Sequence, residues 1–194
     1  MLFHEAKAFI LDKLNDELPT HLTYHCFDHT LDVYAAAENL ADLEKIGLYQ
    51  KELVLTAALF HDSGFIIGAN CHEEESCRIA EQYLPRYGYV IDDLEAVKGM
   101  IMATKLPQAP KDHLEEIMAD ADLDYLGRDD FFPISEGLYK EFMLSGIVAN
   151  YDDWNRLQVA FFENHHYFTQ SAQAIRNLKK AENLALIKAK IRRY

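Results

Sequence analysis

The chain has 194 residues, of which 49% are hydrophobic and 26% charged, and its formal net charge at pH 7 is -13. This length and composition are typical of one soluble globular domain. The excess of acidic side chains argues against a nucleic acid as the main partner, because binding to that polyanion requires clustered Lys and Arg. A small phosphorylated substrate is not excluded, since a bound divalent ion reverses the local field.

The cysteines and the first residues of the chain indicate in which cellular compartment the protein is expected. The three cysteines form no CxxC motif, which is typical of a reducing cytosol rather than of a disulfide framework or a structural zinc site. Charges interrupt the apolar pattern of residues 1–7, so neither a signal peptide nor a membrane anchor is expected there. No apolar run approaches the roughly 20 residues of a membrane span. We therefore expect a cytoplasmic protein without membrane contact.

Helical periodicity extends along almost the whole chain and predicts an all-α protein folded as a single domain over residues 1–194. Residues 87–91 form the only short β-like run. The first predicted helix ends before Pro19, the second begins around residues 27–30 and is stopped by Gly47, and the third ends at His61-Asp62. The fourth and fifth are opened by the capping boxes Asn70-x-x-Glu73 and Asp92-x-x-Glu95, and the sixth covers residues 112–127. The seventh begins near Pro133, and two more between Asp152 and Tyr194 meet near Thr169.

The third predicted helix carries the strongest chemical signal. Residues 53–60 are almost all apolar and lead directly into His61 and Asp62. Burying an ionised carboxylate is costly unless it is paired or bound to a cation. Gly64 lets the chain turn away after this pair, so the two side chains can converge on one metal ion.

A second pair of histidines lies near the start of the second predicted helix. If that helix opens at residues 23–28, His25 and His29 are one turn apart on the same face, and His29 points toward the core. An ordinary core histidine is the alternative for this pair.

A third candidate lies in the acidic end of the sixth predicted helix. Asp122 is at the edge of the apolar face, so a metal or a buried partner is expected for it. Asp120 and Asp124 project to the opposite side and are expected to form a solvated acidic face.

Together His29, His61, Asp62 and Asp122 form a mixed nitrogen and oxygen ligand set. Such a set suits a six-coordinate Mn, Fe, Co, Ni or Mg ion and leaves positions for water. The two carboxylates balance a dication, which can acidify water for nucleophilic attack. Zn, a second ion, and a buried polar network without any ion stay as alternatives.

In order and spacing these residues resemble the H…HD…D signature of the HD-domain metal-dependent phosphohydrolases. The Leu-Phe pair before the doublet and Gly64 after it match as well, and the likeness runs from about Leu18 to Phe131. The resemblance implies an HD-type helical bundle that hydrolyses phosphate esters or anhydrides. Residues 133–194 resemble the C-terminal helical cap of small bacterial members.

Tyr24-His25-x-x-x-His29 also resembles the YHxxxH element of the cyclic-nucleotide phosphodiesterases, which are HD-type enzymes. The resemblance implies that His25 is a general acid, a role that suits imidazole because it titrates near neutral pH. The further Asp and His of that pattern do not follow the doublet here, where Ser63-Gly64 stands instead. A phosphodiester substrate is therefore not implied.

Further candidates surround this set. His72 matches a ligand position of relatives with two bridged ions, although it could instead stack on its neighbours. Lys105, at the end of the apolar fifth helix, is expected to bind phosphate unless it reaches solvent. Arg128 is likewise expected to bind phosphate or, alternatively, to cap its helix. His165-His166, among aromatic residues, is expected to pack in the core or in a lid rather than to bind metal.

The predicted function is metal-dependent hydrolysis of a small phosphorylated metabolite, with a nucleotide as the expected substrate. In this hypothesis the ion is held by His29, His61, Asp62 and Asp122, and His25 and Lys105 assist the reaction. The alternative is a non-catalytic sensor module that binds metal or nucleotide in the same helical pocket.

Overall fold

The computed structural model describes residues 1–191, which contain nine α-helices, three short 3₁₀-helices and no strand. The all-α prediction is confirmed. Among the described residues, no helix combines the length and the apolar character that crossing a membrane requires. The elements are α1 (Phe3–Glu17), α2 (Phe27–Leu43), α3 (Leu48–Phe60), η1 (Ser63–Ile66), α4 (His72–Tyr83), η2 (Leu84–Tyr87), α5 (Ile91–Ala103), α6 (His113–Asp122), η3 (Asp124–Gly127), α7 (Phe131–Leu144), α8 (Tyr151–Asn164) and α9 (Gln170–Ile191).

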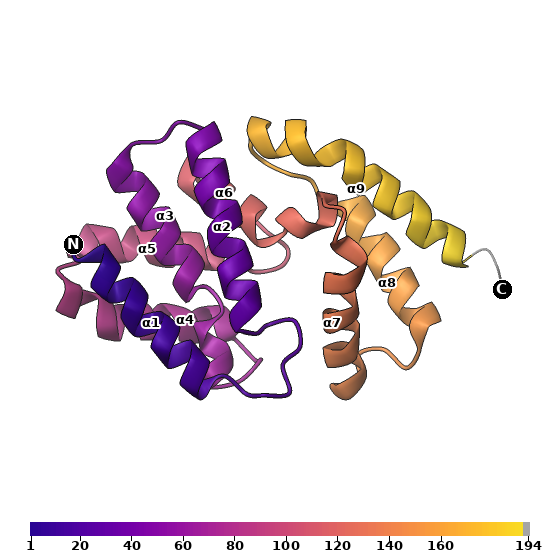
Figure 1. The fold of residues 1–194 in the computed structure, drawn as a ribbon, viewed down its shortest axis with the longest axis horizontal. Helices are drawn as coiled ribbons and strands as arrows, with labels where there is room; N and C mark the ends of the chain where they lie inside the picture. The colour runs from indigo at the N-terminus through magenta and orange to yellow at the C-terminus, as the bar shows by residue number, and fades with distance from the viewer. Residues whose placement is uncertain (192–194) are drawn as a thin grey trace.

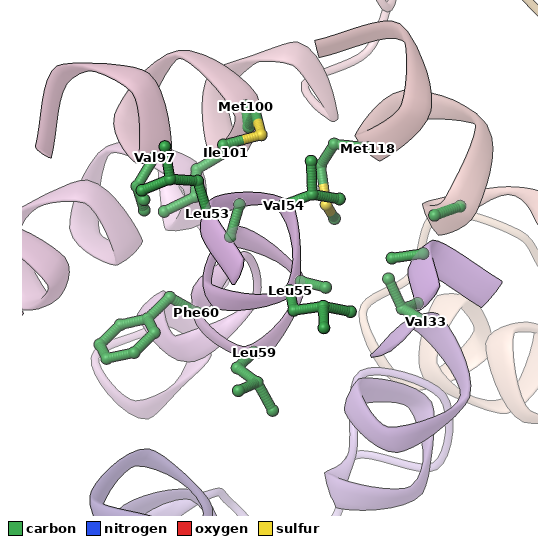
Figure 2. Packing of buried hydrophobic residues seen from close by; sticks show 14 of the residues in the cluster. Val33, Leu53, Val54, Leu55, Leu59, Phe60, Val97, Met100, Ile101 and Met118 are labelled. Carbon is green, nitrogen blue, oxygen red and sulfur yellow. The ribbon is translucent and has the colours of Figure 1, made fainter. Parts of the chain in front are cut away.

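Helix α3 is the centre of the larger core. All residues from Leu53 to Phe60 are buried, so this part of the helix is apolar around its whole circumference and needs neighbours on every side. Each buried Leu or Phe side chain contributes about 1.5–3 kcal/mol to stability. Figure 2 shows α3 surrounded by side chains of α2, α5 and α6, among them Val33, Val97, Met100, Ile101 and Met118.

The three C-terminal helices form a second group. In Figure 1, α7, α8 and α9 lie on one side of the molecule and α1 to α6 on the other, while α9 reaches back toward α2. Two smaller cores lie in this part of the molecule, one in which Phe131, Phe162 and Ile187 pack with Tyr24 and Tyr125, and another around Tyr139 and Trp154. The two groups therefore meet along a seam in which side chains of both can line a cavity.

Both predicted capping boxes are wrong in register. Helix α4 begins at His72 after Cys71, which has a left-handed backbone (φ 56°), and no side chain caps its first turn. Helix α5 begins at Ile91, and the Asp93 carboxylate accepts a hydrogen bond from the Val90 backbone N at 3.0 Å. Acidic residues are frequent near the first turns of both α4 and α5, so the capping-box motif fits more than one starting residue. Packing of the apolar face of each helix determines which residue begins it.

Several predicted helix limits also change. The second predicted helix ends at Leu43, and Gly47 is instead the residue before α3. The sixth is interrupted, because α6 ends at Asp122 and residues 124–127 form the separate η3. The last predicted helix, which extends to Tyr194, is described as α9 to Ile191, and its remaining residues lie outside the described residues.

The β-like run at residues 87–91 joins η2 to α5 and is not a strand. Its most buried residue, Tyr89, is 4% exposed, and its hydroxyl lies 2.7 Å from the Thr56 hydroxyl of α3. The run therefore holds one anchored side chain and takes no part in sheet pairing.

Asp120 and Asp124 do not form a solvated acidic face, and that prediction is wrong. Asp120 is fully buried and accepts hydrogen bonds from the backbone N atoms of Phe168 and Thr169, both at 2.8 Å. Asp124 is 3% exposed and binds the Arg176 guanidinium through two hydrogen bonds of 2.7 and 3.0 Å. The segment leading into α9 covers this side of α6, which a helical wheel of α6 alone does not reveal.

Asp120→Ala is expected to lower the free energy of unfolding by about 3 kcal/mol, because the backbone N–H groups of Phe168 (partly buried) and Thr169 (buried) lose their charged acceptor. Urea unfolding followed by circular dichroism measures the change. Asp12→Ala, at an exposed position on α1, is the control and should change stability by no more than about 0.5 kcal/mol. Equal stability of the two variants would contradict the anchoring role of Asp120.

Candidate metal centre and adjoining cavity

Three helices bring the four predicted ligands together. His29 lies in the first turns of α2, His61 and Asp62 directly follow α3, and Asp122 is the last residue of α6. The C-terminal end of a helix carries a partial negative charge that favours a cation. Because α3 and α6 both end here, their backbone dipoles add to the negative charge of the carboxylates.

The side chains converge closely. The Nε2 atom of His61 lies 3.2 Å from Asp62 Oδ2 and 3.4 Å from Asp122 Oδ1. The Nε2 atom of His29 lies 3.5 Å from each of the same two oxygens. Ligand atoms of His29, His61 and Asp122 all lie within 4.8 Å of one another, and Asp62 borders this group through its Oδ2 atom. The structure therefore brings all four residues to one place.

Unpaired buried atoms show that this set fits a divalent ion. The His61 Nδ1–H donates to the Ala58 carbonyl at 2.9 Å, which leaves Nε2 directed at the carboxylates. Within residues 1–191, the buried atoms His29 Nε2, His61 Nε2 and Asp62 Oδ2 have no hydrogen-bond partner. Buried polar atoms are normally paired. Two imidazoles and two carboxylates with orphaned atoms facing a common point are a suitable donor set for a divalent metal.

The carboxylates of this cluster are ionised at neutral pH. Burial alone would raise the pKa of Asp62 and of Asp122, but the neighbouring imidazoles lower both values, that of Asp122 to about 2. Burial would likewise lower the pKa of His61, and the adjacent carboxylates, Asp62 first, raise it well above its usual value. The two carboxylates thus carry negative charge that either a proton on His61 or a bound cation can balance.

His72 lies on the far side of Asp62. Its Nε2 atom is 3.5 Å from Asp62 Oδ1 and 3.6 Å from Glu73 Oε1. Close backbone packing brings it there, because a Cβ at position 64 would lie 1.9 Å from the His72 carbonyl oxygen. Gly64 is thus required for the approach of α4 to η1.

His25 is held by a residue that the sequence did not indicate. The loop before α2 carries His25, so it does not share a helix with His29, contrary to the predicted register. Its Nδ1 atom lies 2.6 Å from Glu141 Oε2 of α7. The other oxygen of Glu141 accepts hydrogen bonds from the backbone N atoms of Thr23, Tyr24 and His25 at 2.7, 2.6 and 3.0 Å.

This anchoring leaves the Nε2 atom of His25 as the ring nitrogen that can serve a bound molecule. Burial alone would raise the pKa of Glu141, but the hydrogen bonds from His25 and the backbone lower it, so Glu141 is a carboxylate at neutral pH. The His25 ring also stacks on Phe65, with ring centroids 4.2 Å apart. Ring orientation and tautomer of His25 are therefore both restrained.

A cavity of about 620 Å³ adjoins the cluster and lies between the two helix groups. Asp62, Asp122, His25 and His72 line it on the side of α1 to α6, and side chains of α7 and α8 line the opposite side. This volume is within the range of small-molecule sites, about 300–1,000 Å³.

The two predicted cationic contacts differ in their placement. Lys105 lines the cavity and forms an ion pair with Glu74, which raises its pKa. Arg128 lies outside the cavity lining, where its guanidinium binds Asp32 at 2.8 Å and Asp130 at 2.9 Å. Arg128 therefore joins α2 to the start of α7 instead of facing the cavity.

His165 and His166 do not join the metal cluster. The His165 ring stacks on Phe161 and meets Tyr167 edge-on. Burial lowers the pKa of His165 to about 3, so this ring is neutral at physiological pH. His166 is exposed. The packing role expected for His165 agrees with these contacts.

The comparisons with known proteins agree with this geometry. A family model described as HD domain matches residues 26–124. No curated protein matches the chain in sequence. A solved structure of a predicted HD superfamily hydrolase from an uncultured Thermotogales bacterium is 19% identical, with a TM-score of 0.62, and the alignment covers 96% of this chain and 89% of that one. A protein from Lactobacillus plantarum is 18% identical, with a TM-score of 0.65 and 98% of both chains covered.

Proposed function

This chain belongs to the HD domain family, and we propose that it is a metal-dependent phosphohydrolase that acts on a small phosphorylated metabolite. The observation that carries the proposal is the buried cluster of two imidazoles and two carboxylates whose orphaned atoms face one another beside a cavity. A divalent ion bound by His29, His61, Asp62 and Asp122 would polarise a phosphoryl group and lower the pKa of a nearby water molecule.

The protein's own residues supply the remaining parts of the reaction. In this proposal His25 donates a proton from Nε2 to the leaving oxygen of the substrate. Glu141 holds the ring in place through Nδ1. Lys105 lines the cavity and offsets negative charge on the phosphoryl oxygens. Glu74 keeps the Lys105 side chain near the cavity until substrate competes for it.

A substrate screen tests the proposal. Purified protein with Mn²⁺ is incubated with nucleoside mono-, di- and triphosphates, cyclic nucleotides, and simple phosphate esters, and released phosphate and pyrophosphate are measured. We expect release from at least one class, loss of release after chelation by EDTA, and recovery after Mn²⁺ is restored. Nucleotides are included because they are the expected substrate class.

The same screen separates hydrolysis from sensing. Thermal unfolding is followed for each compound in parallel. Stabilisation by a nucleotide without release of phosphate or pyrophosphate would contradict the hydrolase proposal and would assign the site to ligand sensing.

A further inference from the structure

On the basis of the proposed function, we infer that the substrate is a phosphate monoester whose alcohol portion carries a large apolar group. The phosphate lies at the metal cluster, and the apolar group lies against α7 and α8. Three features of the cavity support this assignment: its far wall is apolar, it contains a single Lys or Arg among the described lining residues, and few polar side chains of α7 and α8 face it.

The far wall of the cavity is apolar. It is formed by Leu126 of η3 and by side chains of α7 and α8. Trp154 is 5% exposed and Leu126 1%, whereas Leu157 is 40% exposed and forms part of the rim. A phosphate ester without an apolar portion would leave this surface in water, whereas burial of apolar ligand atoms against it stabilises the complex. The side chains that carry the argument are Leu126, Leu138, Phe142, Trp154, Leu157 and Phe161.

Charge in the cavity limits the number of phosphates. Among the described residues that line it, Lys105 is the one Lys or Arg, whereas Asp62, Glu73 and Asp122 are carboxylates. Lys105 is also paired with Glu74. A triphosphate would bring three or more negative charges into this acidic site, and like charges repel strongly where solvent is partly excluded. A single phosphate needs only the ion and Lys105.

Two polar side chains of α8, Gln158 and Asn164, line the cavity, and one polar atom of each has a partner within the protein. The Gln158 side-chain oxygen accepts a hydrogen bond from Ser135 at 2.8 Å in a buried position. The Asn164 side-chain amide donates to the Ala160 carbonyl at 2.7 Å. The other lining residues of α7 and α8 are apolar or aromatic, so this side offers few groups to recognise a polar base or sugar. Apolar contact is the mode of recognition that this wall offers.

Alkylphosphonates test the inference by binding, because their C–P bond is not hydrolysed. Isothermal titration calorimetry with Mn²⁺ present compares n-octylphosphonate, methylphosphonate and inorganic triphosphate. We expect n-octylphosphonate to bind about 50-fold more tightly than methylphosphonate, which corresponds to about three buried methylenes at roughly fourfold each. Equal affinity of the two phosphonates, or tighter binding of triphosphate than of n-octylphosphonate, would overturn the inference.

A pair of leucine variants locates the apolar group. Leu157→Asn should weaken n-octylphosphonate about 5- to 10-fold and change methylphosphonate less than about twofold. The control is Leu178→Asn, at a position on α9 that is 77% exposed and outside the cavity lining. Both substitutions place Asn in a helix interior, so their effects on folding are matched. Indistinguishable n-octylphosphonate affinities in the two variants would place the group elsewhere and refute the assignment.

Turnover of the matching esters separates this inference from the proposed function. If n-octylphosphonate binds as expected but n-octyl phosphate releases no phosphate, the hydrolase proposal fails and the assignment of the apolar wall stands. If methyl phosphate and n-octyl phosphate are hydrolysed with equal kcat/KM, the hydrolase proposal stands and the substrate inference fails.

Discussion

Replacement of His61 by alanine is expected to abolish metal binding and to reduce phosphate release by more than about 1,000-fold. His61 is 1% exposed, and its Nε2 atom faces both carboxylates of the cluster. Its ring cannot turn away, because Nδ1 is bound to the Ala58 carbonyl. Without this imidazole the remaining donors are two carboxylates and His29. Elemental analysis of the purified variant and a phosphate-release assay measure both effects.

Control variants make the His61 result specific. His21→Ala removes a histidine at an exposed loop position and should leave both metal content and activity unchanged. Wild-type protein should also gain thermal stability on addition of Mn²⁺, because an ion that binds only the folded state stabilises it, and the His61→Ala variant should not. Wild-type metal content in His61→Ala or in Asp62→Ala would show that the ligand assignment is wrong.

His25→Ala is expected to lower kcat by about 100- to 1,000-fold and to leave metal content unchanged. The reason is that His25 is the proton donor in the proposed function but lies outside the cluster of His29, His61 and Asp122 that could hold the ion. The loss should depend on the leaving group: large for an alkyl phosphate, whose alkoxide needs a proton, and much smaller for p-nitrophenyl phosphate, whose phenolate is stable. Steady-state kinetics with the two esters give the comparison.

Glu141→Gln serves as the companion variant for His25. Glutamine keeps a side-chain oxygen for the backbone N atoms of Thr23, Tyr24 and His25 but removes the carboxylate that binds the imidazole. For Glu141→Gln we expect a smaller decrease in kcat than for His25→Ala, again larger for the alkyl phosphate than for p-nitrophenyl phosphate. Equal losses for both esters in His25→Ala would exclude proton donation to the leaving group.

The residues around the ion could be predicted because local sequence marks them strongly. The apolar segment that becomes α3 leads without a break into His61 and Asp62, and burial of this segment places both residues in the core. His29 and Asp122 lie on the inner faces or edges of their helices, where the helical period places them. Short-range pattern was sufficient for these positions because each helix buries the face that its own sequence defines.

Contacts between distant segments could not be predicted in the same way. Glu141 is one of two acids in α7, the other being Glu136, and it meets His25 only because the C-terminal helices fold back over the loop before α2. A helical wheel predicts that Asp120 faces solvent, because the segment that covers it begins 45 residues later in the sequence, at His165. The guanidinium of Arg128 binds Asp32 of α2, which is distant in sequence, as well as the nearby Asp130. In each case a tertiary partner, absent from the local pattern, decides the role of the side chain.

The Glu141 contact also has an evolutionary consequence. The matched family region, residues 26–124, contains His29, His61, Asp62 and Asp122, whereas the apolar wall and Glu141 come from α7 and α8. If the proposed function holds, ion chemistry and substrate choice reside in separate stretches of chain, and new specificities can arise in the second stretch without loss of the first. The proton donor is the exception, because its position depends on α7. If α7 diverges toward a different substrate, the carboxylate of Glu141 must be preserved, because otherwise His25 is no longer held in place to donate a proton.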